Sequence, residues 1–146
     1  MVKTLLMFLF SDRTDTYVNV IAYTNDKLDV KSVRLVHVKG ARTALSDEEA
    51  RTMETRILRQ IQSLAEGKYT DFPPLSEKGK DPIEKPLKDQ SKIGIYARVH
   101  EQMDRHLDTL SCSSLREELA SLVKSCGGMQ NCIVDFTATT KMASLE

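Results

Sequence analysis

Apolar residues are concentrated in a few short runs, and the first of these is almost uninterrupted. Residues 2–10 read Val-Lys-Thr-Leu-Leu-Met-Phe-Leu-Phe, a pattern typical of a strand that is buried on both faces of a parallel sheet. Residues 33–38, Val-Arg-Leu-Val-His-Val, form a second predicted strand. Between them, residues 16–23 are rich in β-branched and aromatic side chains, which favour a strand, whereas a β-α-β unit would require a helix there. The pattern leaves both possibilities open for that segment.

Two segments have the pattern of an amphipathic helix with a capping box at its start. Ser46 is followed by Glu49, and apolar side chains then recur every three or four residues as far as Gly67. Ser114 and Glu117 repeat the pairing ahead of a second apolar stripe. We predict a helix in each segment, because such a serine and glutamate can bond to backbone N–H groups that the first turn of a helix leaves without partners.

The rest of the chain predicts one more helix, one more strand and one irregular excursion. Apolar residues between 93 and 110 suit one face of a helix, which we predict, although residues 93–99 are also compatible with a strand. Residues 132–136, Cys-Ile-Val-Asp-Phe, form a predicted strand. Residues 69–90 contain all four prolines and few large apolar side chains, so we expect a surface loop or excursion there, with a short edge strand near residues 83–87.

The alternation of predicted strands and helices indicates the fold class. It is typical of an α/β fold with a Rossmann-like open, mainly parallel sheet flanked by helices. The 146 residues are enough for one hydrophobic core, so we expect a single domain over residues 1–146, from which the excursion of residues 69–90 projects.

Charge and cysteine content narrow the functional class. The chain has 21 basic and 21 acidic side chains, so no whole-protein field draws it to duplex nucleic acid. Its three cysteines include no C-x-x-C pair, which fits a reducing compartment. The first apolar run is too short to span a bilayer, and the polar sequence Ser-Asp-Arg follows it. We therefore expect a cytoplasmic protein that is not attached to a membrane.

The histidines and the common catalytic motifs give no sign of a catalytic centre. His100 and His106 stand six residues apart, which places them well apart around a helix, and His37 lies in a predicted strand, where it packs or points outward. We therefore expect no metal. The sequence also lacks a P-loop, a G-x-G-x-x-G motif and a G-x-S-x-G motif, and it identifies no catalytic residue.

Polar loops follow the first and the last predicted strand, and these loops carry the candidate ligand-binding residues. The carboxyl ends of parallel strands meet at one edge of a sheet, which is where open α/β sheets bind ligands. Hydroxyl groups, backbone N–H groups, a guanidinium and an ammonium all suit a phosphate, so we predict a single phosphodiester-binding site, although a helix cap with solvated charges is also compatible with the last loop. The candidates are Ser11, Asp12, Arg13 and Thr14 in the first loop, and Thr137, Thr139, Thr140 and Lys141 in the last.

These loops resemble those of a known family, the CRISPR-associated Rossmann fold (CARF) sensor domains. The resemblance lies in a strand that leads into Asp-x-Thr-x-x-x-Lys, here Asp135, Thr137 and Lys141, and in the strand followed by serine at Phe10 and Ser11. It implies a homodimer that binds a cyclic oligoadenylate second messenger across the dimer interface with both loops of each subunit. It further implies a regulatory domain that controls an attached effector in CRISPR antiviral defence, and hence that the chain is the N-terminal part of a longer protein.

Two other functions are compatible with the same sequence. The first is a stand-alone ring nuclease, a metal-independent phosphodiesterase that cleaves cyclic oligoadenylate, in which Thr140 and Lys141 would assist the reaction. The second is a Rossmann-like protein-interaction module that binds no small molecule and contacts a partner through its proline-rich excursion. We expect no cofactor in any of the three cases.

Overall fold

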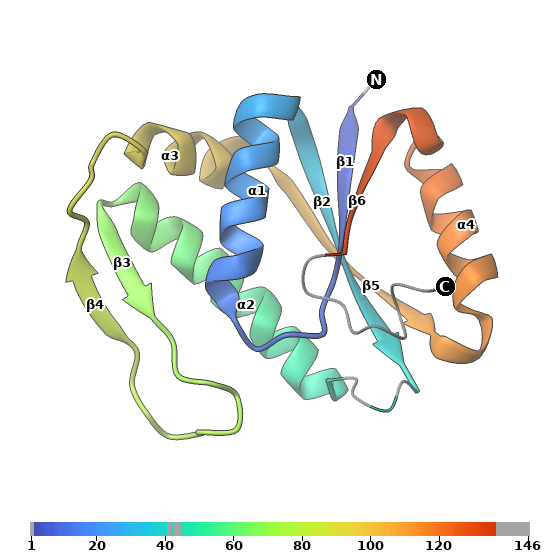
Figure 1. Ribbon diagram of the computed structural model, residues 1–146, viewed down its shortest axis with the longest axis horizontal. Helices are drawn as coiled ribbons and strands as arrows, with labels where there is room; N and C mark the ends of the chain where they lie inside the picture. The colour runs from blue at the N-terminus through green and yellow to red at the C-terminus, as the bar shows by residue number, and fades with distance from the viewer. Residues whose placement is uncertain (1, 41, 43–44, 137–146) are drawn as a thin grey trace.

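The computed structural model describes residues 2–40, 42 and 45–136 and shows a central parallel sheet. The sheet has four strands in the order β5-β2-β1-β6 (Figure 1). The strands are β1 (Lys3–Phe8), β2 (Val30–Lys39), β5 (Asp104–Ser111) and β6 (Cys132–Asp135). The helices are α1 (Thr14–Leu28), α2 (Asp47–Ala65), α3 (Ile93–Gln102) and α4 (Leu115–Ser125). The described chain is therefore a Rossmann-like α/β fold, which confirms the predicted fold class.

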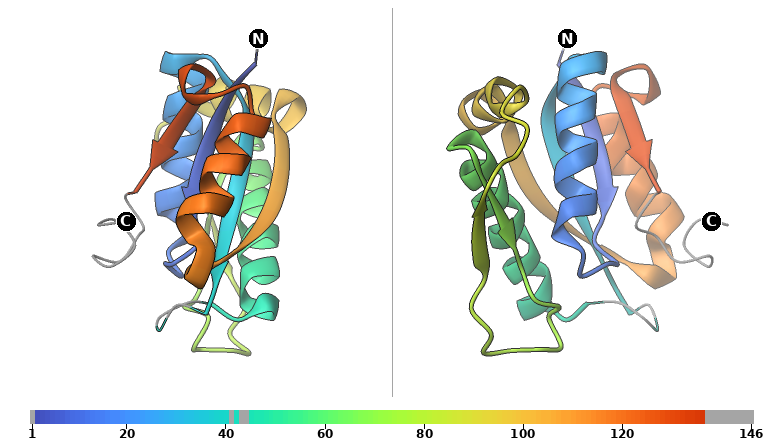
Figure 2. Two further views of the ribbon diagram at one scale, coloured as in Figure 1. Left: turned by 90° about the vertical axis from the view of Figure 1, so that its right-hand side faces the viewer. Right: turned by 60° about the vertical axis from the view of Figure 1, so that its left-hand side comes forward.

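The two faces of the sheet are covered unequally. Helices α1, α2 and α3 lie on one face, and α4 lies on the other (Figure 2). Because side chains alternate along a strand, Leu5 and Met7 of β1 join the large core cluster under the three helices, whereas Phe8 joins a smaller cluster with Leu115 of α4. Strand β1 lies at the centre of the sheet, and its residues from Thr4 to Phe8 are all buried, as the uninterrupted apolar run predicted.

Helix α1 resolves the segment that the sequence pattern left open, because residues 16–23 are helical. Strands β1 and β2 pair directly and in parallel, so the chain must cross over between them, and this requirement overrides the local preference for a strand. The helix ends at Asp29, which adopts the left-handed conformation with φ 57°. Beside it, the Asn25 side-chain amide donates to the Val30 carbonyl oxygen over 2.9 Å and joins the helix to β2.

The predicted helix over residues 93–110 is correct only in its first part. Helix α3 ends at Gln102, and the following residues form β5, so the prediction was wrong from residue 103 onward. Strand β5 pairs with β2 from Asp104 to Ser111, and eight paired positions outweigh an apolar spacing that matched a helix by coincidence. This strand lies at the edge of the sheet and is largely polar, which is why it lacked the apolar run seen in β1.

The two predicted capping boxes have different outcomes. At the start of α2, the Ser46 side chain accepts from the Glu49 N–H and the Glu49 carboxylate accepts from the Ser46 N–H, each over 3.1 Å, as predicted. At α4 the helix forms but the box was wrong. The carboxylate of Glu118, rather than Glu117, accepts from the Ser114 hydroxyl over 2.9 Å and from the Ser111 N–H over 2.6 Å, because α4 follows a short 3₁₀ turn over Cys112–Ser114.

The proline-rich segment contains a two-stranded antiparallel hairpin that packs beside α2. Its strands are β3 (Lys68–Asp71) and β4 (Ile83–Pro86). The short strand expected near residues 83–87 is confirmed, whereas β3 was not predicted. Most of the hairpin is exposed, but Thr70 and Leu75 are buried, and Leu75 belongs to the core cluster under α1, α2 and α3.

Candidate functional site

The strand order places a topological switch point between β1 and β6. From β1 the chain moves outward to β2 and then β5 on one side, and it returns to add β6 on the other side. Strands β1 and β6 are parallel neighbours, with Met7 opposite Asp135, so their carboxyl ends lie side by side. The first candidate loop starts at the end of β1, and the chain leaves β6 at the same edge. Candidates Thr137, Thr139, Thr140 and Lys141 lie outside the described residues.

The hydroxyl group of Tyr17 in α1 forms hydrogen bonds that hold the loop after β1 in place. Its hydroxyl oxygen accepts from the N–H groups of Phe10 over 3.1 Å and Ser11 over 2.9 Å, and the hydroxyl donates to the Phe8 carbonyl oxygen over 3.2 Å. Burial, with smaller contributions from the carboxylates of Asp12 and Asp135, raises the pKa of Tyr17 to about 12, although the N–H groups of Ser11 and Phe10 lower it. The phenol therefore stays neutral and acts as a structural hydrogen-bonding group.

Ser11 and Arg13 lead the chain from this loop into α1. The Arg13 N–H donates to the Ser11 hydroxyl oxygen over 3.1 Å, which closes a tight turn. Arg13 is also the residue before the helix, and neither its side chain nor that of another described residue caps the N–H groups of the first turn, which begins at Thr14. The Arg13 side chain is 73% exposed, and its guanidinium lies 3.7 Å from an Asp15 carboxylate oxygen, a contact that a stronger anion could replace.

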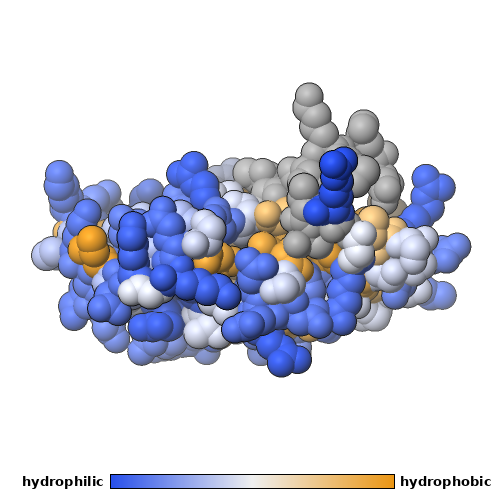
Figure 3. Space-filling model, turned by 90° about the horizontal axis from the view of Figure 1, so that it is seen from below, coloured by the Kyte–Doolittle hydropathy of each residue, from blue (hydrophilic) through white to orange (hydrophobic). Residues whose placement is uncertain are grey.

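Aromatic rings line the loop on the side of β6. The rings of Phe8 and Phe136 stack at 5.6 Å between centroids, and Phe8 and Phe10 stack at 6.5 Å. We call this side the β6 flank. Viewed onto this end of the molecule, the surface is mostly hydrophilic, with hydrophobic patches near its centre (Figure 3).

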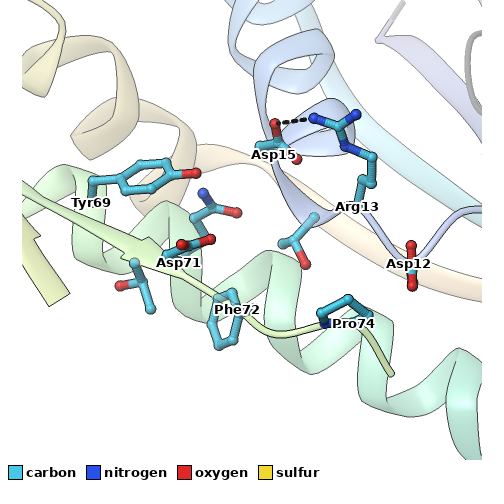
Figure 4. Close-up of a pocket in the computed structure, with 10 residues that line it drawn as sticks. Asp12, Arg13, Asp15, Tyr69, Asp71, Phe72 and Pro74 are labelled. Carbon is cyan, nitrogen blue, oxygen red and sulfur yellow. Dashed lines mark ion pairs between the residues drawn. The ribbon is translucent and has the colours of Figure 1, made fainter. Parts of the chain in front are cut away.

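On its other side the loop borders a cavity of about 380 Å³ (Figure 4). Residues 12–15 line it from the start of α1, Gln60 lines it from α2, and residues 69–72 with Pro74 line it from β3 and the turn that follows. We call this side the hairpin flank. Among the predicted residues, Asp12, Arg13 and Thr14 share this cavity, whereas Ser11 does not.

Carboxylates dominate the charge on the hairpin flank. Asp12, Asp15 and Asp71 line the cavity together with the single cation Arg13. Burial raises the pKa of the Tyr69 phenol, and the nearby Asp15 and Asp71 carboxylates raise it further, while Arg13 lowers it. These groups are therefore close enough to Tyr69 for their charges to act on it.

The residues that line the cavity from α2 and β3 were not predicted from the sequence. Gln60 could have been noticed, because it is a polar residue within the apolar stripe of α2, between Ile57 and Leu64. A glutamine at such a position is either paired in the core or turned toward a cavity. Thr70 carried no such signal, because it lies in a four-residue strand within a polar segment.

The histidines and cysteines of the described chain form no metal site. Among the described residues, no group of three or more histidine, cysteine, aspartate or glutamate side chains could hold a metal ion. His37 is buried, with its Nε2 atom 2.6 Å from the Leu45 carbonyl oxygen, in agreement with a packing role. The three cysteines are half-buried free thiols.

Across the described helices, no segment combines the length and the hydrophobicity that a bilayer-spanning helix requires. No protein-family model, curated protein or solved structure matches the chain.

Proposed function

We propose that the chain is a sensor domain that binds a cyclic oligoadenylate at the carboxyl edge of β1 and β6, and that it controls an attached effector in CRISPR antiviral defence. The observation that carries this proposal is the switch in strand order between β1 and β6. Open α/β sheets bind ligands in the crevice outside the strand ends at such a point. The loops Ser11–Thr14 and Thr137–Lys141 follow these two strands in the sequence.

The chemistry of the first loop favours a phosphate of the ligand. The start of α1 carries the positive end of the helix dipole, equivalent to about half a charge and partly offset by Asp15, and no side chain of the described residues caps its N–H groups. The exposed Arg13 guanidinium can form two parallel hydrogen bonds to one phosphate. Asp12 and Asp135 oppose a polyanion here, since both carboxylates act on Tyr17 at the same edge. Arg13 and Lys141 therefore have to offset them.

Symmetry supports binding between two copies of the chain. A cyclic oligoadenylate repeats the same nucleotide around a ring, so a ring with an even number of units has two-fold symmetry. A two-fold dimer offers the same loops twice, and each subunit then makes equal contacts to its half of the ring. We accordingly propose a homodimer with one ligand at its interface.

A thermal-shift titration tests the proposal directly. Cyclic tri-, tetra- and hexa-adenylate would be added to the protein, with linear oligoadenylate as the control ligand. A ligand at 100 times its dissociation constant should stabilise the folded state by about 2.7 kcal/mol. The expected result is stabilisation by one ring size, lost in Arg13→Ala and in Lys141→Ala. Lys27→Ala is the matched control, because Lys27 lies in the last turn of α1, at the opposite end of the same helix.

The competing functions give different results in the same samples. A ring nuclease would release linear product on prolonged incubation, which anion-exchange chromatography detects. A protein-interaction module would show no stabilisation by any ring size, and this outcome would overturn the sensor proposal. Sedimentation with and without ligand measures whether the dimer forms.

A further inference from the structure

Unpaired polar atoms in the described core gather at the cavity of the hairpin flank. Four buried side-chain atoms have no hydrogen-bond partner in the described part of the chain, and three of them belong to residues that line this cavity. They are Thr14 Oγ1, Gln60 Oε1 and Thr70 Oγ1, and their residues are 4%, 2% and 4% exposed. Buried polar groups are nearly always paired in native proteins. Three exceptions at one cavity indicate groups that are kept for a ligand rather than for the core.

The hydrogen-bonding capacity of these atoms indicates what kind of ligand they suit. The Gln60 Oε1 atom is an acceptor only, and so are the ionised carboxylates of Asp12, Asp15 and Asp71. The hydroxyl groups of threonine and tyrosine can act either as acceptors or as donors. The cavity is therefore rich in acceptors and calls for a ligand that is rich in donors.

The charge of the cavity leads to the same conclusion. Three carboxylates and one guanidinium line the cavity, and that guanidinium is already next to Asp15. The Arg56 guanidinium lies close enough to interact with Asp12, so the carboxylates still outnumber the nearby cations. The start of α1 adds a positive end of about half a charge, which Asp15 in the first turn offsets. An anionic ligand would be repelled here, whereas a cation would be attracted.

We propose that this cavity binds a small organic cation with primary ammonium groups, of the diamine or polyamine class. Asp15 from α1 and Asp71 from β3 lie on opposite sides of the cavity, and the Tyr69 hydroxyl points into the space between the two elements (Figure 4). An ammonium group donates three hydrogen bonds, which suits carboxylates together with Gln60 Oε1. The Tyr69 ring offers an apolar and cation-attracting surface to the methylene chain. The cavity of about 380 Å³ is in the size range of small-molecule sites.

This site shares Asp12, Arg13 and Thr14 with the loop of the proposed nucleotide site. The nucleotide proposal rests on the edge of β1 and β6, and the amine proposal rests on Gln60, Thr70 and Asp71, so either one can fail without the other. A divalent metal is a poorer candidate, because the described residues contain no cluster of three metal-binding side chains.

Calorimetric titration with putrescine and with spermidine tests the proposal, at constant ionic strength. The expected result is saturable binding of at least one of the two amines. In Asp71→Asn the affinity should fall about tenfold or more, because a charge-assisted hydrogen bond is lost. The matched control is Asp81→Asn, which removes the same charge from an exposed position in the connection between β3 and β4 and should bind as the unchanged protein does. Equal binding in Asp71→Asn, no binding by either amine, or the same heat with MgCl₂ would overturn the proposal.

A second variant separates ligand binding from folding. Thr70→Val keeps the shape of the side chain and removes its unpaired hydroxyl, so the protein without ligand should melt at a higher temperature. The same variant should bind the amine several-fold more weakly, because one of the groups that contact it has gone. A raised melting temperature with undiminished amine binding in both Thr70→Val and Gln60→Met would show that the unpaired atoms do not contact the ligand, which would overturn the site as proposed.

Discussion

The loop after β1 and the cavity on its hairpin flank differ in how their polar groups are paired. At the loop, the Tyr17 hydroxyl oxygen accepts from two backbone N–H groups and lies within hydrogen-bonding distance of the Phe8 and Ser11 carbonyl oxygens. On the hairpin flank, Thr14, Gln60 and Thr70 each carry a buried oxygen atom without a partner among the described residues. Paired groups stabilise a structure, and unpaired ones destabilise it. The comparison teaches that hydrogen bonds hold the loop rigid, whereas the cavity on the hairpin flank retains groups that stability alone would remove.

Alkaline pH should remove the Tyr17 proton and destabilise the loop, and it should lower the free energy of unfolding more than any other change considered. The pKa of Tyr17 is raised from the ordinary value of 10.0 to about 12. As the pH rises between these two values, the unfolded chain loses the phenolic proton while the folded protein keeps it, so the free energy of unfolding falls. Below pH ~10 both states keep the proton, and the free energy of unfolding is undiminished. Its loss approaches about 3 kcal/mol above pH ~12, since one pKa unit corresponds to about 1.4 kcal/mol. Urea denaturation from about pH 9 to about pH 12 measures the loss.

The variant Tyr17→Phe identifies the source of that alkaline loss. Burial also raises the pKa values of Tyr69 and Tyr96, so part of the loss should remain in the variant. A pH dependence identical to that of the unchanged protein would show that Tyr17 is not the group responsible.

The same substitution should weaken the protein at neutral pH. Tyr17→Phe leaves the N–H groups of Phe10 and Ser11 without their acceptor, and both are partly buried. The free energy of unfolding should fall by about 2 kcal/mol, the range expected for buried groups left unpaired. Urea denaturation at neutral pH measures it, and amide hydrogen exchange at residues 10 and 11 shows whether the loop itself has loosened. A change below about 0.5 kcal/mol would mean that water replaces the hydroxyl without loss.

The hairpin flank should respond to substitution in the opposite direction. Gln60→Met keeps the length of the side chain and removes an unpaired buried oxygen, so we expect the free energy of unfolding to rise by about 1 kcal/mol. Gln62→Met is the control, because Gln62 lies on the exposed face of the same helix and should change stability little. Thermal denaturation of both variants without ligand makes the comparison. A destabilised Gln60→Met would mean that the amide is paired in solution.

Elements that are encoded by local patterns could be predicted from the sequence, whereas those that depend on long-range pairing could not. Strand β1 and the capping box at Ser46 are encoded by local patterns, a continuous apolar run in one case and two side chains that serve the first turn in the other. Helix α1 and strand β5 depend on the rest of the sheet. Helix α1 exists because β1 and β2 are parallel, and β5 exists because β2 offers it eight pairing positions. Neither requirement is visible in the residues of the segment itself.

The residues of the candidate site also fall into a predicted group and an unpredicted group. Residues 11–14 were predicted because a polar loop directly follows an obvious strand, and the switch point beside them follows from the strand order. The cavity on the hairpin flank was not predicted, because it joins this loop to Gln60 and to a four-residue strand in a segment read as a surface excursion. Long-range packing creates that cavity. Among its lining residues from α2 and β3, Gln60 departs from a local pattern, because it is polar within an apolar stripe.

Arg13 gives the smallest effect on stability and the clearest separation of stability from binding. Its side chain is 73% exposed, and its ion pair with Asp15 has an N–O distance of 3.7 Å, so Arg13→Ala should change the free energy of unfolding by less than about 0.5 kcal/mol. Affinity for the cyclic oligoadenylate should nevertheless fall about tenfold, because a bidentate phosphate contact is lost. Lys27→Ala should alter neither quantity. If Arg13→Ala binds the ring as tightly as the unchanged protein, the phosphate is held by the helix N-terminus and the last loop alone. If it also gains affinity for spermidine, Arg13 is the cation that limits amine binding on the hairpin flank, since its removal takes away the ion-pair partner of Asp15.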